Sequence, residues 1–496
     1  MSMRQLSLIF QTFNVLDNHL KVVFFSYKVI FKTNKFDCQK RLFCVFPPPR
    51  NMSTIRLCDY DCVGFDLDNT LLQYNITNLI TLEYQLLVDF LVDMKKYSPK
   101  YLKEPFTEKV MDFMQKGLIL DFDRGNILKL DASGRIWRAS HGTKLLTLEE
   151  LESTYPGLRW DVTDKFFQDM FSTWNGELSL KIRALLDYFD MPVSLIFAKI
   201  VDTLDEEQKP SVYNIWPDIM EGLTHIFSRE QFQNNGDFFS ALKSNPEKYL
   251  HLCSSDTISW IRELKKKRKN FLITGSNADF IDFTAGYAFG KDWRSLFDIV
   301  VCYAKKPGFF VPTGRDFVPT GRDFLPTGRD FLRLEGYEEK CTIEAKELKE
   351  GGIYSQGNWK ELTDFFTRIT GKNNPKCLYL GDNLIQDVYV PNAFRDCDII
   401  VVVDEQLAEK MVHHELSHSD EIIINSKFWG SYFSLEEPEG YRDSYWNHII
   451  RNHSKVCIPK VEVIATIPLD QPIECFDKET KNANGYFPAK PLSLHV

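Results

Sequence analysis

Short apolar runs without polar interruption recur along the chain and predict a buried parallel sheet. They lie at residues 62–65, 270–273, 298–302, 377–380 and 398–403. A strand covered on both faces has a continuous hydrophobic sequence, whereas a strand with one solvated face alternates between apolar and polar residues. An amphipathic stretch at 256–267 precedes the second run and predicts a covering helix. The pattern therefore favours the α/β class.

The first two runs are separated by far more chain than one crossover needs. From residue 66 to residue 274 there are 208 positions (274 minus 66), whereas a parallel crossover needs about a dozen residues. We therefore expect a discontinuous core at 52–82 and 255–420, an inserted cap domain at 83–254, and a C-terminal segment packing on the core at 421–496. Inside the insertion the pattern predicts a helix at 82–94, a hairpin at 127–140 and a largely apolar helix at 180–204.

Residues 1–51 differ in composition from the rest of the chain. They are apolar, aromatic and basic, with Asp17 and Asp37 as the only carboxylates. Lysines interrupt the apolar stretch at 20–32, so this stretch cannot span a bilayer cheaply. A mitochondrial targeting segment would suit the charge, although arginine and serine are few. We favour an appended leader outside the fold, or an extension that results from the choice of start codon.

Residues 311–331 form a tandem repeat. The unit Val-Pro-Thr-Gly-Arg-Asp-Phe occurs twice and is followed by Leu-Pro-Thr-Gly-Arg-Asp-Phe. Pro and Gly in every copy exclude a continuous helix and favour repeated turns. Arg315, Arg322 and Arg329 would equip a partner-binding arm. A duplication tolerated in a surface loop is the simpler interpretation, because long loops are accommodated at little cost.

The overall composition is that of a globular protein. With 496 residues, 44% hydrophobic and 26% charged, the chain exceeds the size at which one core keeps growing, so two domains are expected. A formal net charge of -9 and the lack of a long basic tract argue against nucleic acid or a membrane surface as partner. Eleven cysteines without a Cys-x-x-Cys pair, with Cys62, Cys302 and Cys377 in apolar runs, indicate buried reduced thiols. This favours the cytosol.

Two carboxylates follow the first apolar run. They are Asp66 and Asp68 in Asp66-Leu67-Asp68-Asn69-Thr70. In an extended chain, side chains two positions apart share one side, so both carboxylates can converge on one reacting centre. A carboxylate can attack a phosphate monoester while a second one protonates the leaving alcohol. We expect Asp66 to be the nucleophile and Asp68 the proton donor, although a helix cap or solvated turn would explain this pair alone.

A second acidic pair ends a later apolar run. Gly381-Asp382 closes the run at 377–380, and Asp387 follows five positions later (387 minus 382). Two anions must approach each other in the reaction, so a cation is required, and Mg²⁺ prefers carboxylate and phosphate oxygens. We expect Asp66, the backbone carbonyl of Asp68 and Asp382 to hold it. Asp387 would either help to hold the metal or orient a neighbouring lysine from its second coordination shell.

Two further segments offer groups for the phosphoryl oxygens. The run at 270–273 ends at Thr274-Gly275-Ser276, where a hydroxyl and free backbone N–H groups could hold phosphate. Lys306 supplies a positive charge for the transition state. Each alone would suit a helix cap or a surface lysine. Their order along the chain, nucleophile, hydroxyl, lysine and acidic pair, makes the combination specific.

These motifs resemble the haloacid dehalogenase superfamily of phosphatases, and more narrowly the cytosolic purine 5'-nucleotidase group. The second position past the nucleophile carries Asp68, where the P-type ATPases of the superfamily have Thr. The likeness runs from about residue 55 to near the carboxyl end, interrupted around 311–331, and includes 117–121, 125–131, 141–143, 189–192 and 354–358. It implies a haloacid dehalogenase-like, Rossmann-like core with a large cap, Mg²⁺, and a nucleoside 5'-monophosphate as substrate.

The substrate contacts implied by the resemblance are only partly present. The cap, with the His141 loop, would cover the base, and Ser276, His141 and Lys144 are the expected substrate-binding residues. An aromatic position that stacks on the base in the purine enzyme becomes Thr143 here, and an Arg and an Asp that contact the base become Met220 and Thr224. A site without these polar groups should discriminate purines poorly. His141 could equally be a structural, hydrogen-bonded histidine.

Three functions stay open at this point. We favour a metal-dependent phosphomonoesterase that hydrolyses a nucleoside 5'-monophosphate through an aspartyl-phosphate. The alternatives are a phosphatase for another small phosphorylated metabolite and an interaction protein that retains the metal site. A scaffold would need neither Asp68 nor Lys306, which favours the enzyme. The sequence leaves a homo-oligomer open, and the mitochondrion replaces the cytoplasm if residues 1–51 are a targeting segment.

Overall fold

The computed structural model describes most of the chain after residue 52. The described ranges are 53–170, 172–175, 177–207, 209–312, 329–409, 416–438, 440–477 and 484–495. The leader predicted at 1–51 lies outside these ranges, as do residues 313–328 of the tandem repeat. All elements below belong to one compact unit, Thr54–Val496.

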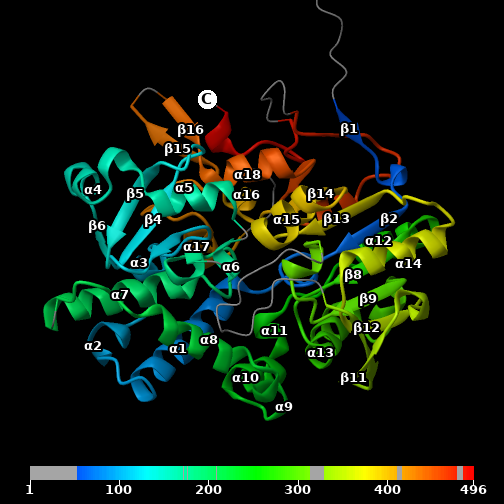
Figure 1. Cartoon of the computed structure of the whole chain (residues 1–496), viewed down its shortest axis with the longest axis horizontal. Helices are drawn as coiled ribbons and strands as arrows, with labels where there is room; N and C mark the ends of the chain where they lie inside the picture. Colours follow the sequence, from blue (N-terminus) through cyan, green and yellow to red (C-terminus); the bar gives the residue numbers. More distant parts are fainter. Residues whose placement is uncertain are drawn as a thin grey trace, which may run out of the picture. The chain divides into compact units, whose positions relative to one another are not determined.

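A nine-stranded sheet forms the core, in the order β11-β10-β12-β9-β8-β2-β13-β14-β17 (Figure 1). From β12 to β17 all neighbours are parallel, and β10 and β11 add an antiparallel edge. The strands are β2 (Cys62–Phe65), β8 (Lys269–Ile273), β9 (Ile299–Cys302), β10 (Phe331–Glu335), β11 (Glu338–Ile343), β12 (Gly352–Gln356), β13 (Cys377–Gly381), β14 (Cys397–Val402) and β17 (Val456–Ile458). The predicted α/β fold with a parallel sheet is confirmed.

Both faces of this sheet are covered. Phe65, Leu272 and Leu380 belong to one hydrophobic cluster, and the alternate residues Phe271 and Tyr379 belong to another. Burial on both faces explains why the strands lack polar alternation in the sequence. The first cluster includes residues of α12 (Ser255–Lys267) and α13 (Ala278–Phe289), the second residues of α14 (Trp359–Thr370) and α18 (Tyr445–His453).

The chain between β2 and β8 contains a second sheet and several helices, and we call residues 76–249 the cap segment. The second sheet is antiparallel, in the order β6-β5-β4-β3-β7, with β3 (Ile119–Asp121), β4 (Asn126–Leu130), β5 (Ile136–His141), β6 (Lys144–Leu145) and β7 (Ile182–Ala184). The longer helices of the cap segment are α1 (Ile76–Asp93), α7 (Pro192–Glu207), α8 (Trp216–Phe227) and α10 (Asp237–Ser244). Helix α1 packs against α7 and α8. The β4–β5 pair is the hairpin that the sequence predicts.

Two helices differ from the sequence prediction. Helix α1 begins at Ile76 instead of 82, because the Asn75 side chain accepts a hydrogen bond from the Asn78 N–H and caps it. The helix predicted at 180–204 is wrong in its first part, where Ile182–Ala184 is β7, paired with β3. Helix α7 begins at Pro192, whose fixed φ and missing N–H suit the first helical position.

The C-terminal part adds the last strand and short elements. Strand β17 pairs with β14, β1 (Thr54–Ile55) pairs with β18 (Ile473–Glu474), and β15 (Ser434–Glu437) pairs with β16 (Gly440–Asp443).

Short helices along the chain are α2 (Pro99–Leu102), α3 (Glu108–Met111), α4 (Leu148–Thr154), α5 (Asp161–Gln168), α6 (Ser172–Asn175), α9 (Arg229–Gln233), α11 (Pro246–Tyr249), α15 (Val390–Phe394), α16 (Glu405–Ala408), α17 (His418–Ile424) and α19 (Glu462–Ala465). None of the described helices is both long and apolar enough to cross a membrane.

The cysteines form no disulfide among the described residues. Cys62, Cys302 and Cys377 are buried inside strands of the core sheet, as the sequence predicts.

Candidate active site

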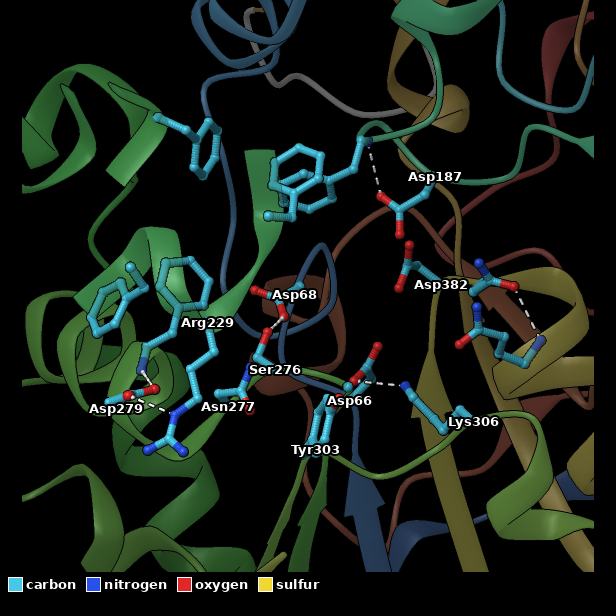
Figure 2. A pocket seen from close by; sticks show the side chains of 18 of the residues that line it. Asp66, Asp68, Asp187, Arg229, Ser276, Asn277, Asp279, Tyr303, Lys306 and Asp382 are labelled. Carbon is cyan, nitrogen blue, oxygen red and sulfur yellow. Dashed lines mark hydrogen bonds and ion pairs between the residues drawn. The ribbon is translucent and has the colours of Figure 1, made fainter. Parts of the chain in front are cut away.

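Four segments meet where β2, β8, β9 and β13 end at the same edge of the sheet. Asp66 follows β2, Thr274 follows β8, the loop to Lys306 follows β9 and Asp382 follows β13. A pocket of about 310 Å³ opens here, and Asp66, Lys306 and Asp382 line it (Figure 2). Ligands of parallel α/β sheets bind at this edge, beyond the carboxyl ends of the strands. The motifs scattered along the sequence therefore share one crevice.

Lys306 lies between two carboxylates. Its Nζ is 2.9 Å from Asp66 Oδ1 and 2.7 Å from Asp387 Oδ1. Burial opposes its charge, but Asp387 and Asp66 outweigh burial and raise the pKa of Lys306, so the ammonium stays charged. The loop that carries Lys306 is held beside the loop after β8, because the Tyr303 and Ala304 N–H groups donate to the backbone carbonyls of Ser276 and Thr274.

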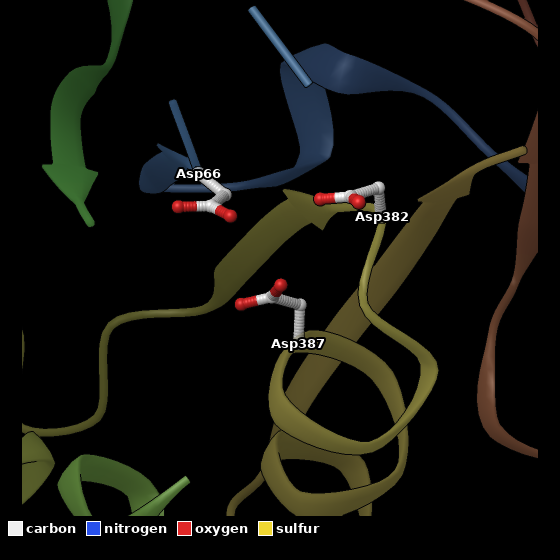
Figure 3. A group of neighbouring side chains, drawn as sticks. All are labelled: Asp66, Asp382 and Asp387. Atoms are coloured by element: carbon white, nitrogen blue, oxygen red, sulfur yellow. The ribbon is translucent and has the colours of Figure 1, made fainter. Parts of the chain in front are cut away.

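The carboxylates of Asp66, Asp382 and Asp387 form a buried acidic triad. One carboxylate oxygen of each residue lies within 4.8 Å of the corresponding oxygens of the other two (Figure 3). Burial raises the pKa of Asp66 and of Asp382 well above the usual range, and neighbouring carboxylates add to both shifts. Asp382 Oδ2 is buried and has no hydrogen-bond partner in the described part of the chain. The three carboxylates offer only oxygen atoms as metal ligands. Such a set suits a hard divalent cation.

Asp387 is the member of the triad whose oxygens are already engaged. Its Oδ1 accepts from Lys306 and from the Tyr379 hydroxyl at 3.1 Å, and its Oδ2 accepts from the Asn383 N–H at 3.3 Å. It sits on a single π-helical turn, η7 (Leu384–Tyr389). A Cβ on Gly381 would lie 2.4 Å from Asp387 Cβ, so the glycine before Asp382 permits this approach. Asp387 thus contacts Lys306, and its role in holding the metal or in orienting this lysine stays a prediction.

Asp68 is held by two hydroxyl groups. Its Oδ1 accepts from the Tyr74 hydroxyl at 2.7 Å and its Oδ2 from the Ser276 hydroxyl at 2.7 Å. Between Asp68 and Asp66, Leu67 is fully buried, as the alternation of side chains requires. The next residue, Asn69, adopts a left-handed conformation (φ 53°) and donates to Asp187 Oδ1 at 3.0 Å. Asp68 therefore faces the pocket in a fixed orientation.

Three of the predicted residues do not line the pocket. Thr274 is fully buried, and its hydroxyl accepts from the Ser276 N–H at 3.1 Å. Instead, Gly275, Ser276 and Asn277 face the pocket at the start of α13. The lining drawn from the described residues also excludes His141 and Lys144. Their place in substrate binding stays a prediction that this geometry does not support.

The contacts of His141 and Lys144 explain their absence from the pocket. The ring nitrogens of His141 lie 2.8 Å from Asn126 Oδ1 and 2.9 Å from Asp205 Oδ2, which is the structural role that the sequence left open. The side chain of Lys144 is 70% exposed and pairs with Glu150.

The cap segment and α13 add residues that the motifs did not indicate. Asp187 lines the pocket next to Asp382 (Figure 2), and burial and Asp190 raise the pKa of Asp187 to about 7. Arg229 also lines it, and its Nε donates to Asp279 at 3.0 Å. The remaining lining includes Phe189, Phe227, Phe232, Phe238, Phe239 and Phe280. In the sequence these aromatic residues are indistinguishable from ordinary core positions.

Comparison with known proteins shows which family the chain resembles. Residues 51–427 match the sequence profile of the 5' nucleotidase family. The chain belongs to this family. It is 35% identical over 459 residues to 5'-nucleotidase domain-containing protein 1 of Bos taurus and 33% identical over 460 residues to that of Homo sapiens, each time over 88% of this chain and 96% of the relative. It is 27% identical over 338 residues to 5'-nucleotidase domain-containing protein 2 of Homo sapiens, over 67% of this chain and 58% of that protein.

Membership of the 5'-nucleotidase family confirms the resemblance that the motifs indicated. The α/β core with its parallel sheet is the haloacid dehalogenase-like fold expected of this family. The chain is accordingly a hydrolase of phosphoric monoesters, as the sequence predicts.

Proposed function

We propose that this 5'-nucleotidase-family hydrolase cleaves nucleoside 5'-monophosphates with the help of Mg²⁺ and through an aspartyl-phosphate on Asp66. The observation that carries the proposal is the buried acidic triad, with Lys306 joining two of its members and Asp68 facing the same pocket. The names of the relatives support a 5'-nucleotide as the substrate. We also propose, from the sequence alone, a cytoplasmic location.

The metal would be held by Asp66 and Asp382. The buried Asp382 Oδ2 offers a free lone pair, and the backbone carbonyl of Asp68 is the third expected donor. Asp387 already binds Lys306, Tyr379 and Asn383, so it is left to support this set from outside. When bound, a divalent cation neutralises charge on the phosphate and on Asp66, which lowers the repulsion between them.

In the first step an Asp66 carboxylate oxygen attacks phosphorus. The bond between phosphorus and the ester oxygen breaks, and this oxygen takes a proton from Asp68. Lys306, whose ammonium is 2.9 Å from Asp66, favours the ionised nucleophile and stabilises the phosphoryl oxygens in the transition state. Ser276 and Tyr74 hold Asp68 in position for the transfer.

In the second step Asp68 acts as a base. Now ionised, it takes a proton from water, and the water oxygen attacks phosphorus. The bond between phosphorus and the Asp66 oxygen breaks, which releases inorganic phosphate and restores both aspartates. Burial of the pocket floor, where Asp66 is 7% and Asp382 5% exposed, limits competing water.

Phosphate release from nucleoside 5'-monophosphates tests the proposal. We expect turnover that requires Mg²⁺, is abolished by a chelator, and falls by roughly 10³-fold or more in Asp66→Asn. Asp89→Asn is the matched control, because that side chain is 58% exposed on α1. Full metal-dependent activity in a folded Asp66→Asn protein would contradict the proposal.

A further inference from the structure

Asp187 brings a carboxylate of the cap segment next to the acidic triad. It lies in the loop between β7 and α7, whereas Asp66 and Asp382 directly follow strands of the core. Figure 2 shows the carboxylates of Asp187 and Asp382 pointing toward one another. Burial raises the pKa of Asp382 most, and Asp187 follows as the neighbouring carboxylate with the largest effect, which reflects how close the two groups lie. Two acidic side chains from separate parts of the chain therefore face each other.

Each of these two carboxylates keeps one oxygen without a protein donor. Asp187 Oδ1 accepts from the Asn69 side chain at 3.0 Å and from the Phe189 N–H at 3.2 Å, but no described residue donates to its Oδ2. Asp382 Oδ1 accepts from the Thr70 hydroxyl at 3.3 Å, whereas its Oδ2 is buried and has no hydrogen-bond partner in the described part of the chain. A buried acceptor costs free energy unless a ligand or water satisfies it, so these oxygens indicate a bound ligand.

Lys116 does not fill this role. Its positive charge opposes the effect of burial on the pKa of both carboxyl groups. However, its ammonium is paired with Glu405, 3.2 Å from Oε1, and both of these side chains are buried. Two ionised carboxylates that face each other repel, so they need a positive charge between them. An ion from outside the protein supplies it.

The charges that line the pocket support this conclusion. Among the described residues, six aspartates and two basic residues line it, an excess of four carboxylates (6 minus 2). The basic residues are Lys306 and Arg229, and each is already paired with an aspartate of the lining. Asp68, Asp187 and Asp382 have no basic partner among the described residues. A phosphate monoester is itself an anion, so the pocket must bind a cation before it can accept one.

We infer that Asp187 helps to bind the divalent cation, as a residue that the cap segment contributes to the metal site beside Asp382. This inference rests on the metal site of the proposed function and goes beyond it, because the ligands named there all belong to the core. Mg²⁺ dehydrates reluctantly and keeps several waters as ligands. Asp187 lies outside the triad of mutually close oxygens, so it accepts hydrogen bonds from these waters. Binding of the cation therefore holds the cap segment against the core strands.

The substitution Asp187→Asn tests this role with little disturbance of the loop. The amide keeps an oxygen acceptor for Asn69 and Phe189 and removes the charge on the side that faces Asp382 (Figure 2). Titration calorimetry with MgCl₂ in the absence of substrate measures the affinity directly. We expect Kd for Mg²⁺ to rise at least about tenfold, the lower end of the effect of a carboxylate that supports the ligands of a metal.

Asp279→Asn is the matched control for charge. Asp279 lines the same pocket from α13, and Figure 2 shows it on the other side of the pocket from Asp382. The substitution therefore removes the same charge from the same pocket at a greater distance from the metal site. Its Kd for Mg²⁺ should stay within about threefold of the wild-type value, because attraction between distant charges is screened.

Hydrogen exchange in the wild-type chain tests the inference without any substitution. Addition of Mg²⁺ should slow amide exchange at residues 185–190 of the cap segment, as well as in the loops after β2 and β13. The reason is that the cation stabilises the state in which these segments are held together. Exchange in the turn at 132–134, between β4 and β5, should not change.

The inference is overturned if Asp187→Asn binds Mg²⁺ as tightly as the wild type, if Asp279→Asn weakens binding equally, or if Mg²⁺ leaves exchange at 185–190 unchanged. Failure of the proposed function is a different result. A wild-type chain that binds Mg²⁺ with the help of Asp187 but releases no phosphate would refute the function and leave the inference standing. A folded wild-type chain that binds no Mg²⁺ would refute both.

Discussion

At the scale of single residues, the orientation of Asp68 decides whether one carboxyl can give and later take a proton. Its two oxygens bind two different hydroxyl groups, from Tyr74 and Ser276, each at 2.7 Å. Hydrogen bonds to an ionised group are about twice as strong as neutral ones and fix its direction. Tyr74 is therefore a positioning residue for Asp68.

Removal of the Tyr74 hydroxyl should slow the reaction without unfolding the protein. We expect Tyr74→Phe to lower kcat by roughly tenfold, the equivalent of one charge-assisted hydrogen bond, with little change in KM. Steady-state kinetics at several pH values measure it, since a changed pH profile separates an effect on Asp68 from a loss of folded protein. Tyr97→Phe is the control, because Tyr97 makes a similar bond to Asp218, 2.9 Å long, outside the pocket. Equal kcat in Tyr74→Phe and wild type would contradict the positioning role.

The sequence predicts the residues at strand ends better than the residues that support them. Asp66, Asp382 and Lys306 can be predicted from the sequence, because parallel strands end at one edge of a sheet. Residues that follow such strands along the chain are therefore expected to lie close together. Asp187 lines the pocket from the cap segment, and Tyr74 contacts Asp68 from the turn before α1. Their positions depend on packing between distant elements, which no local pattern records.

At the scale of elements, Arg229 joins the cap segment to the core. It is the first residue of α9, and it binds Asp279 in α13 and Glu338 in β11. Asp279 is 8% exposed, so loss of its partner would leave a nearly buried charge unpaired. The side chain of Arg229 is itself 26% exposed, and solvent screening reduces the strength of the pair.

Arg229→Met should lower the free energy of unfolding by roughly 1–3 kcal/mol. The loss should be smaller when Asp279→Asn is already present, because the neutral amide needs no counter-charge. A double-mutant cycle by urea denaturation measures this coupling. Arg333→Met serves as the control, with an expected change within about 0.5 kcal/mol, because that side chain is 51% exposed. Additive effects of Arg229→Met and Asp279→Asn would contradict a stabilising ion pair between the two residues.

The elements of the core follow from hydrophobic pattern, whereas those of the cap segment follow only in part. Buried parallel strands such as β13 and β14 consist of continuous apolar residues, which makes their existence evident. The apolar stretch at 180–204 has no such distinguishing mark. It divides into strand β7 and helix α7 because β7 pairs with β3, a tertiary contact that overrides local propensity.

At the scale of the whole molecule, hydrogen bonds join the C-terminal segment to the cap segment. Lys129 in β4 donates to Gln115 Oε1 at 2.7 Å and to the carbonyls of Trp429 at 2.9 Å and Ser431 at 2.8 Å. The indole of Trp446 donates to Gly117 O at 2.6 Å. The contacts of Lys129 with Trp429 and Ser431, and that of Trp446 with Gly117, join residues 300 or more positions apart in sequence. Strand β17 of the same C-terminal segment pairs with the core sheet.

Lys129→Met should destabilise the fold by roughly 2–4 kcal/mol, because several buried oxygens lose their donor at once. Thermal and urea unfolding measure the loss. Lys346→Met is the control, since its side chain is 76% exposed, and it should stay within about 0.5 kcal/mol of wild type. An unchanged unfolding midpoint in Lys129→Met would show that the hydrogen bonds of Lys129 contribute nothing to stability.

The chemistry itself is tested most sharply by trapping the covalent intermediate. The Asp68→Asn chain, mixed with 4-nitrophenyl phosphate and Mg²⁺ and quenched in acid, should carry a phosphoryl group, because this leaving group departs without a proton donor whereas the base for the second step is missing. Mass spectrometry of the proteolysed protein should locate that group on Asp66, and Asp66→Asn should carry none. Turnover by the wild-type chain with a phosphoryl group on another residue, or retained in Asp66→Asn, would contradict the mechanism.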